Sequence, residues 1–122
     1  MENQEELNLG IGTKETVALK PAKVKIEKVS IEPAGKGKKV VCEVKHPDKE
    51  ETIKISELRY IKGTEVVVSG TWINEDEDGL IRKGSALANL LNFLGCKTIK
   101  ELVGKEPNTE LDAKGYLCFK AY

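Results

Sequence analysis

Runs in which apolar and polar residues alternate, separated by turn-forming residues, constrain the fold of this chain more than any other feature. Alternation with a period of two is typical of β-strands that bury one face. It predicts six strands, at residues 16–31, 40–45, 52–61, 65–73, 106–111 and 116–122. In the first, the alternation slips by one residue at Lys28, which indicates a β-bulge. In the fourth, the run Val66-Val67-Val68 predicts burial on both faces.

One amphipathic helix is predicted between the fourth and fifth strands. Ser85 fits the N-cap position, and Gly95 fits the position that follows the end of a helix. The leucines between them recur at the spacing of one helical face: Leu87, Leu90, Leu91 and Leu94. We expect this face to pack on strand residues such as Val44, Val66 and Val68.

A second, shorter helix is predicted to follow, because Thr98 and Glu101 have the spacing of a capping box and Gly104 ends the segment. The order of elements is then four strands, two helices and two more strands. It predicts a mainly β fold, a small OB-like antiparallel β-barrel with one main helix and one short helix. A sheet flanked by one helix, without closure, is the rival architecture.

The chain has the size of one domain. With 122 residues, 39% of them hydrophobic, it can form one modest core. We expect residues 14–122 to form that domain and residues 1–13 to be a flexible acidic N-terminal tail. Acidic residues stand where a signal peptide needs positive charge, and no apolar run reaches the roughly 20 residues that cross a bilayer. These features predict a cytoplasmic protein without a membrane segment.

The formal net charge is zero, but the lysines are unevenly distributed. Residues 14–45 contain nine lysines against four glutamates, and residues 33–39 are predicted to be a lysine-rich turn or flexible loop. A basic segment within a neutral chain predicts one surface for an anionic partner. The other interpretation is that these lysines are simply the solvated outward residues of the strands.

The sequence offers little catalytic chemistry. His46, the only histidine, precedes Pro47 in a charged turn, where we expect a solvent-exposed ring rather than a general base. The cysteines lie at apolar positions without a CxxC pair, which predicts reduced and buried thiols: Cys42, Cys96 and Cys118. We therefore predict that the protein is not an enzyme and has no cofactor.

Two loops have part of a ligand-binding motif. Residues 35–39 are rich in glycine and lysine but lack the spacing of a P-loop, and they lead into a strand rather than a helix. Residues 74–79 follow the first half of a calcium loop, but Ser85 stands where the closing bidentate glutamate belongs. We interpret this acidic loop as an ordinary turn rather than a metal site.

Aromatic residues interleaved with lysines give the better functional signal. Outward aromatic side chains on a barrel can stack on unpaired bases, while lysines contact the phosphates. The predicted nucleic-acid-binding residues are Lys25, Lys36, Lys38, Lys39, Lys45, Tyr60, Trp72, Tyr116, Lys120 and Tyr122. For Tyr60 and Trp72, the alternative interpretation is that they cap the ends of the core.

The C-terminal third contains a leucine-rich helix that ends at Gly95, the turn Glu101-Leu102-Val103-Gly104-Lys105, and a last strand pair that includes Gly115-Tyr116. This arrangement resembles small phage- or archaeal-virus-type proteins of the single-stranded DNA-binding, OB-fold kind. The resemblance implies an accessory role in replication or recombination. The first three strands depart from it, because they contain few aromatic residues.

Three functions are considered, and one of them, a small enzyme or ligand binder, has no acid–base constellation in the sequence to support it. The other two are the main candidates. The first is a non-catalytic accessory protein that binds single-stranded DNA or RNA. The second is a protein-interaction or structural viral accessory module that binds a partner through a β edge. Salt dependence distinguishes them, because contacts with phosphates release counterions and an edge-strand interface does not.

Overall fold

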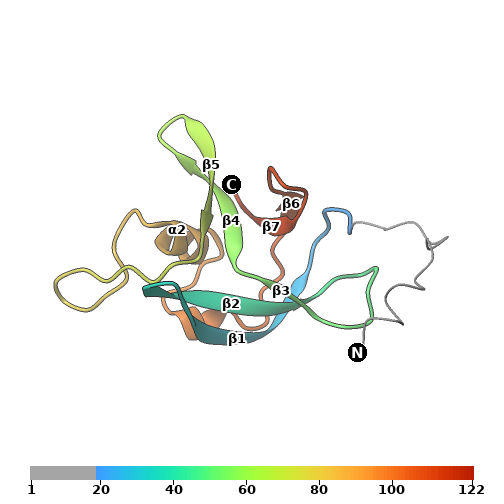
Figure 1. Ribbon diagram of the computed structural model, residues 1–122, viewed down its shortest axis with the longest axis horizontal. Coiled ribbons are helices and arrows are strands. Elements are labelled where there is room, and N and C mark those ends of the chain that lie inside the picture. Colours follow the sequence, from blue (N-terminus) through green and yellow to red (C-terminus); the bar gives the residue numbers. More distant parts are fainter. Residues whose placement is uncertain (1–18) are drawn as a thin grey trace, which may run out of the picture.

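Residues 19–122, which the computed structural model describes, form a mainly β fold with two sheets and one α-helix (Figure 1). The predicted tail and the start of the predicted first strand lie outside the described residues. The elements in chain order are β1 (Lys25–Ala34), β2 (Gly37–Lys45), β3 (Ile53–Ile55), β4 (Glu57–Lys62), β5 (Glu65–Gly70), α2 (Ala86–Phe93), the 3₁₀ helix η1 (Ile99–Leu102), β6 (Thr109–Leu111) and β7 (Leu117–Ala121).

The strands form two sheets, which differ in the number and direction of their strands. β1, β2 and β3 make an antiparallel sheet, and the second sheet has the order β5-β4-β7-β6, in which β4 and β7 run parallel. The predicted bulge is confirmed, because Ile26 pairs with Val44 whereas Lys28 pairs with Glu43. The extra residue lets both Ile26 and Val29 pack against the core, although they are three positions apart.

The described beginning of the predicted first strand is irregular. Residues 19–24 form no strand, and Pro21 accounts for this because it lacks the amide proton that a strand ladder needs. Beyond it, Ala22 is held by the Thr109 hydroxyl, which accepts from the Ala22 amide at 2.9 Å and lies 2.7 Å from its carbonyl. The Thr109 side chain thus forms the hydrogen bonds that the backbone of a neighbouring strand would form in a sheet.

The lysine-rich segment at residues 33–39 is mostly strand rather than loop. β1 continues to Ala34, β2 starts at Gly37, and only Gly35 and Lys36 form the turn. Gly35 has φ +57°, which a glycine adopts without a steric penalty. The lysines of this segment therefore lie on or beside paired strands instead of in a flexible loop.

The predicted strand at residues 52–61 is two strands in different sheets. The chain passes from the first sheet to the second at Ser56. The buried positions change phase there, so that Ile55 before the crossing and Leu58 after it both face the core. The change of phase in the alternation marks the change of sheet.

β5 is an edge strand and ends at Gly70, so the prediction that its valines are buried on both faces is wrong. Val67 packs against the core, whereas Val66 and Val68 are 44% and 41% exposed. In a two-layer fold one face of an edge strand meets the core and the other meets solvent. The prediction that the helix packs on Val66 and Val68 fails for the same reason.

Chain crossings and backbone hydrogen bonds join the two sheets. The segment after β5 lies beside β2, where the Val40 amide donates to the Thr71 carbonyl at 3.0 Å. The segment before β6 lies beside β1, where the Ile26 amide donates to the Lys105 carbonyl at 2.9 Å. The strands of residues 19–122 nevertheless form two sheets and no closed barrel, so the predicted barrel closure is not confirmed.

Both predicted helices are present. The Ser85 hydroxyl accepts a hydrogen bond from the Ala88 amide at 3.2 Å, and Gly95 follows the end of α2 with φ +71°. The second helix is a single 3₁₀ turn. Its Thr98 hydroxyl bonds the Glu101 carboxylate at 3.1 Å instead of a backbone amide, so the two side chains meet without forming the capping box.

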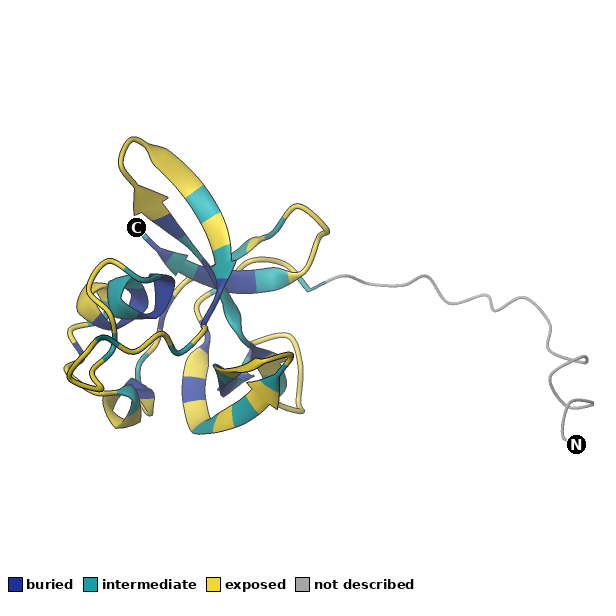
Figure 2. Cartoon of the chain, turned by 60° about the vertical axis from the view of Figure 1, so that its left-hand side comes forward, coloured by how far each residue is buried: buried dark blue, intermediate teal, exposed yellow. Residues whose placement is uncertain are grey.

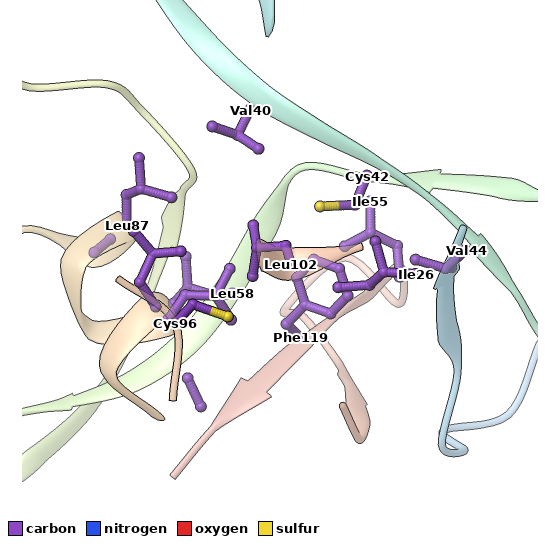
Figure 3. Packing of buried hydrophobic residues seen from close by; sticks show 14 of the residues in the cluster. Ile26, Val40, Cys42, Val44, Ile55, Leu58, Leu87, Cys96, Leu102 and Phe119 are labelled. Atoms are coloured by element: carbon purple, nitrogen blue, oxygen red, sulfur yellow. The ribbon is translucent and has the colours of Figure 1, made fainter. Parts of the chain in front are cut away.

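A single core cluster connects the two sheets and α2 (Figure 3). Phe119 of β7 and Leu102 of η1 lie among side chains from the first sheet, including Ile26. The leucines that α2 buries against the second sheet are the predicted Leu87, Leu90 and Leu91, with Leu94 partly buried. Because the core is shared, the outward faces of the two sheets are held in a fixed relation.

Candidate nucleic-acid interface

The outward face of the first sheet is lined with lysines. In β2, Val40, Cys42 and Val44 point into the core, so the residues between them point outward. The strand pairing extends this face over β1 and β3 and adds Glu32 to Glu43 of β2. The pair of Ser30 and Val41 lies in the middle of the face, and Val41 is buried there. The lysines of this face, which with the two glutamates we call the basic face, are Lys25, Lys28, Lys39, Lys45 and Lys54.

Two ion pairs cross the basic face. Lys28 Nζ lies 3.8 Å from Glu43, and Lys54 Nζ reaches across β2 to within 3.6 Å of Glu32. Both lysine side chains are largely exposed, and such pairs contribute at most about 1 kcal/mol in water. These lysines can therefore exchange a glutamate for a phosphate at small cost.

Trp72 borders the basic face at the beginning of β2. It forms a β-bridge with Lys39, whose ammonium lies 4.9 Å from the centre of the ring in a cation–π contact. The ring also lies over Gly37 and Gly70, and a Cβ at Gly70 would come within 2.9 Å of the indole nitrogen and 2.5 Å of Lys39. A side chain at residue 70 would therefore displace the Lys39 ammonium from the Trp72 ring. Trp72 remains 37% exposed, so part of its ring faces solvent.

Thr71, which is not among the predicted site residues, holds the segment that carries Trp72. Its side chain is fully buried, and its hydroxyl lies 2.5 Å from the Val40 carbonyl and 3.1 Å from the Ser56 carbonyl. Its backbone is hydrogen-bonded to the same two residues: the Thr71 carbonyl accepts from the Val40 amide, and the Thr71 amide donates to the Ser56 carbonyl. One threonine thus ties β2, the crossing between the sheets and the end of β5. A polar residue inside an apolar run gives no sign of this role in the sequence.

Tyr116 borders the first sheet beside β3. It is 68% exposed and lines a hollow of about 360 Å³ together with Ile53 and Ile55. The preceding turn is ordered by Asp112, whose carboxylate accepts hydrogen bonds from the amides of Lys114 at 2.8 Å and Tyr116 at 2.9 Å. These bonds, with the Tyr116 amide first, lower the pKa of Asp112.

The same turn brings two carboxyl groups together. Glu57, at the start of β4, lies beside the Asp112 side chain. Burial, followed by this acidic partner, raises the pKa of Glu57, while Lys39 and Lys114 lie near enough to oppose the shift. The pair lies next to the basic face and reduces its positive charge. No spacing rule connects two acids so far apart in the chain, so the sequence could not reveal it.

The lysines of the β1–β2 hairpin do not share one surface. Lys36 and Lys38 line a groove of about 710 Å³ between the hairpin and residues 73–81. Lys39 lies on the basic face, because neighbouring residues of a strand point to opposite sides. Lys25 and Lys45 do share that face, where they are direct partners across β1 and β2.

The remaining predicted binding residues lie elsewhere. Tyr60 is 7% exposed and belongs to the core, so a stacking role does not fit it and the alternative interpretation holds. Lys120 and Tyr122 lie on the second sheet, with the ammonium 5.1 Å from the ring centre. The Tyr122 hydroxyl is hydrogen-bonded to Glu110. These two residues are not part of the basic face.

His46 is fully buried, contrary to the predicted exposed ring. Its Nδ1 accepts from the Asp48 amide at 3.0 Å, and its Nε2 lies 2.7 Å from the Lys20 carbonyl, to which it donates. The ring thus ties the segment before β1 to the turn after β2. Both nitrogens are engaged in structural bonds.

The three cysteines are buried and unpaired, as predicted. Burial raises the pKa of Cys42 to about 12 and that of Cys118 to about 11. A thiolate is therefore scarce at either residue near neutral pH.

The acidic residues 74–79 belong to a tight hairpin turn. The Asp76 carboxylate accepts from the amides of Asp78 at 2.9 Å and Leu80 at 3.0 Å, and Glu75 forms a β-bridge with Ile81. Within residues 19–122, no three His, Cys, Asp or Glu side chains gather as ligands for a metal ion. The Asp76 carboxylate therefore accepts hydrogen bonds from the backbone amides of its own turn.

No protein-family model, curated protein or solved structure matched the chain. The resemblance to single-stranded DNA-binding proteins therefore stays a prediction from the sequence. In the part of the chain that the structure describes, no helix has the length and apolar character needed to cross a bilayer.

Proposed function

We propose that this protein is a non-catalytic accessory protein, of the replication or recombination type, that binds single-stranded nucleic acid on an OB-like domain. The observation that carries the proposal is the basic face with exposed aromatic rings at two of its borders, Trp72 and Tyr116. Lysines attract phosphates without regard to base sequence, and aromatic rings stack on any base. This combination suits a flexible single strand better than a duplex, whose bases are already stacked.

The backbone connections support the OB-like part of the proposal. Hydrogen bonds lead from β1 to β2 and β3, the chain continues from β3 into β4, and β4 pairs with β7, which pairs with β6. The segment before β6 returns to β1 through the bond between Ile26 and Lys105. If β3 and β4 are counted as one bent strand, this circuit of five strands, with α2 inserted before the last two, supports an OB-like arrangement, which is a five-stranded, partly open Greek-key barrel.

The location of the basic face supports the same proposal. OB-folds bind oligonucleotides on the face of their second and third strands, between neighbouring loops. Here β2 and β3 present Lys39, Lys45 and Lys54 on that face. Trp72 lies beside the start of β2, and Tyr116 lies beside β3. From Lys39 to Glu43, β2 extends about 13 Å, which is room for a short stretch of a single strand.

Binding requires no covalent step. A phosphate backbone displaces Glu43 from Lys28 and Glu32 from Lys54, and it releases the counterions of the other lysines of the basic face. A base stacks on the exposed part of Trp72. The unpaired, buried thiols suit a reducing compartment such as the cytoplasm.

The test is a fluorescence titration with labelled single-stranded and double-stranded oligonucleotides over a range of salt concentrations. We expect preference for the single strand and a linear fall of log affinity with log salt. Lys25→Ala, Lys45→Ala and Lys54→Ala combined should reduce the slope by about two, since each phosphate contact with a single strand contributes about 0.7.

The matched control removes three lysines from another surface. Lys83, Lys97 and Lys100 line a groove beside α2, and their combined replacement by Ala should leave affinity and slope unchanged. Absence of single-strand binding by the wild type at low salt would overturn the proposal. If the two triple variants weakened binding equally, the oligonucleotide would be attracted by the lysines of the whole surface and would not bind specifically to the basic face.

A further inference from the structure

β5 has a free edge. The order β5-β4-β7-β6 leaves one side of β5 without a strand partner among residues 19–122. The β4–β5 hairpin rises from the rest of the molecule in Figure 1, and Figure 2 shows it exposed along much of its length. Every second residue of such an edge presents its N–H and C=O groups to a further strand.

The outward side chains next to this edge are apolar. Val66 pairs with Ile61 and Val68 pairs with Arg59, on the face that points away from the core. Val66, Val68 and Ile61 are 44%, 41% and 51% exposed. β5 contains no proline or lysine, its only charged residue is Glu65, and its pairing with β4 has no bulge. It therefore lacks the features by which edge strands avoid pairing.

The sequence of β5 is complementary to itself in antiparallel pairing. A twofold axis at Val67 places Val67 opposite Val67, Val66 opposite Val68, and Glu65 opposite Ser69 of a second copy. Every valine then meets a valine, and no like charges meet. A shift by one residue would turn one outward face inward. Moving the axis to Val66 or Val68 would leave a valine opposite Glu65 or Gly70.

We propose that β5 pairs with β5 of a second copy of this chain, antiparallel and about a twofold axis at Val67. The interface is isologous, so each copy contributes the same patch and the assembly closes as a dimer. The two second sheets become one continuous sheet, and apolar rows formed by Ile61, Val66 and Val68 cross the junction. The basic face lies on the other sheet and stays free.

The test uses the pairing of Val66 with Val68 of the second copy. Sedimentation velocity of the full chain over a wide concentration range should show a concentration-dependent dimer. Val66→Lys/Val68→Lys places lysines opposite lysines, so we expect at least tenfold weaker association. Val66→Glu/Val68→Lys places each new acid opposite a new base, so we expect the dimer to return. Both positions are exposed, and circular dichroism verifies that each variant is folded.

The matched control is Leu80→Lys/Phe93→Lys, which replaces two exposed apolar residues outside β5 and should leave the dimer unchanged. A wild type that stays monomeric at the highest concentration overturns the proposal, even if it binds a strand of a different protein. A dimer that survives Val66→Lys/Val68→Lys, or one that fails to return in Val66→Glu/Val68→Lys, overturns it as well.

Discussion

The two sheets bury one core but present different chemistry to solvent. The outward residues of β1, β2 and β3 are mainly lysines and glutamates around the pair of Ser30 and Val41, and the charged side chains are held in ion pairs and against Trp72. The outward residues at the β5 end of the second sheet are Ile61, Val66 and Val68. Charged side chains are stable in water and gain from a counterion, whereas an exposed apolar row gains from being covered. The difference separates a surface for an anionic ligand from a surface for another β-strand.

The largest effect is expected where the two regions depend on each other, in the shared core. Phe119 is fully buried between the sheets, so Phe119→Ala should lower the free energy of unfolding by about 3–5 kcal/mol. Both surfaces should then be lost in one cooperative transition. Chemical denaturation followed by circular dichroism measures this loss.

The control for the core substitution is Tyr116→Ala, because Tyr116 is 68% exposed. Its effect on unfolding should stay within about 0.5 kcal/mol, as for other surface changes. If Phe119→Ala were equally mild, or if the two sheets unfolded separately, the shared core would not be what couples them.

The second prediction concerns the corner at Thr71, which joins β2 to the crossing between the sheets next to Trp72. Thr71→Val keeps the size of the side chain but removes its hydroxyl from the Val40 and Ser56 carbonyls. Because a buried hydrogen bond is lost, we expect a cost of about 1–3 kcal/mol. Trp72 is the only tryptophan, so its fluorescence reports directly on the adjacent corner.

The control is the same substitution at Thr64, which is exposed in the turn between β4 and β5. Thr64→Val should change neither the stability nor the tryptophan emission. A Thr71→Val variant as stable as Thr64→Val would show that the buried hydroxyl does not hold the corner.

The sequence predicted features that depend on neighbours in the chain. The Ser85 cap, the leucine face of α2 and the bulge before Lys28 are all local patterns, and all are confirmed. The alternation also changes phase between Ile55 and Leu58, but the sequence does not distinguish a change of sheet from a bend within one strand. Local periodicity shows which face a strand buries, and it does not show which sheet the strand joins.

The candidate site was less predictable, because it depends on residues that only the fold brings together. The lysines at 38 and 39 look like one cluster in the sequence, yet the pleat sends them to different surfaces. His46 and the pair of Glu57 and Asp112 are recognisable only through contacts made by distant segments. Whether a strand lies at the edge of a sheet also depends on distant segments. The exposure of Val66 therefore could not be predicted from the apolar residues next to it in the sequence.

The third prediction separates stacking from charge on the basic face. Trp72→Ala and Tyr116→Ala should each weaken binding of a single strand by about 1–3 kcal/mol. The slope of log affinity against log salt should stay the same, because stacking releases no counterions. Tyr122→Ala, on the second sheet, is the control and should bind like the wild type. Equal losses of affinity in all three variants would mean that the interface extends over both sheets and is not confined to the basic face.

The smallest effect is expected at the carboxyl pair next to the basic face. Burial and Asp112 raise the pKa of Glu57, so its ionised form is less favourable in the folded protein than in the unfolded chain. This cost is present above the raised pKa of Glu57 and disappears as the pH falls below the ordinary carboxyl range. Glu57→Gln removes it and should increase the free energy of unfolding at neutral pH by less than about 1 kcal/mol, the usual size of a surface charge effect.

Thermal unfolding of wild type and Glu57→Gln across acidic and neutral pH checks the sign of this effect. The difference should shrink as the pH falls, because Glu57 becomes protonated in the wild type. Asp112 acts in the opposite direction in both proteins: its lowered pKa gives a stability that is lost as the pH falls through that pKa. Glu57→Gln also removes a negative charge near Lys39, so oligonucleotide affinity should rise at neutral pH. A variant that is less stable than wild type at neutral pH would mean that ionised Glu57 is held by the neighbouring lysines, and the carboxyl pair would then support the basic face instead of weakening it.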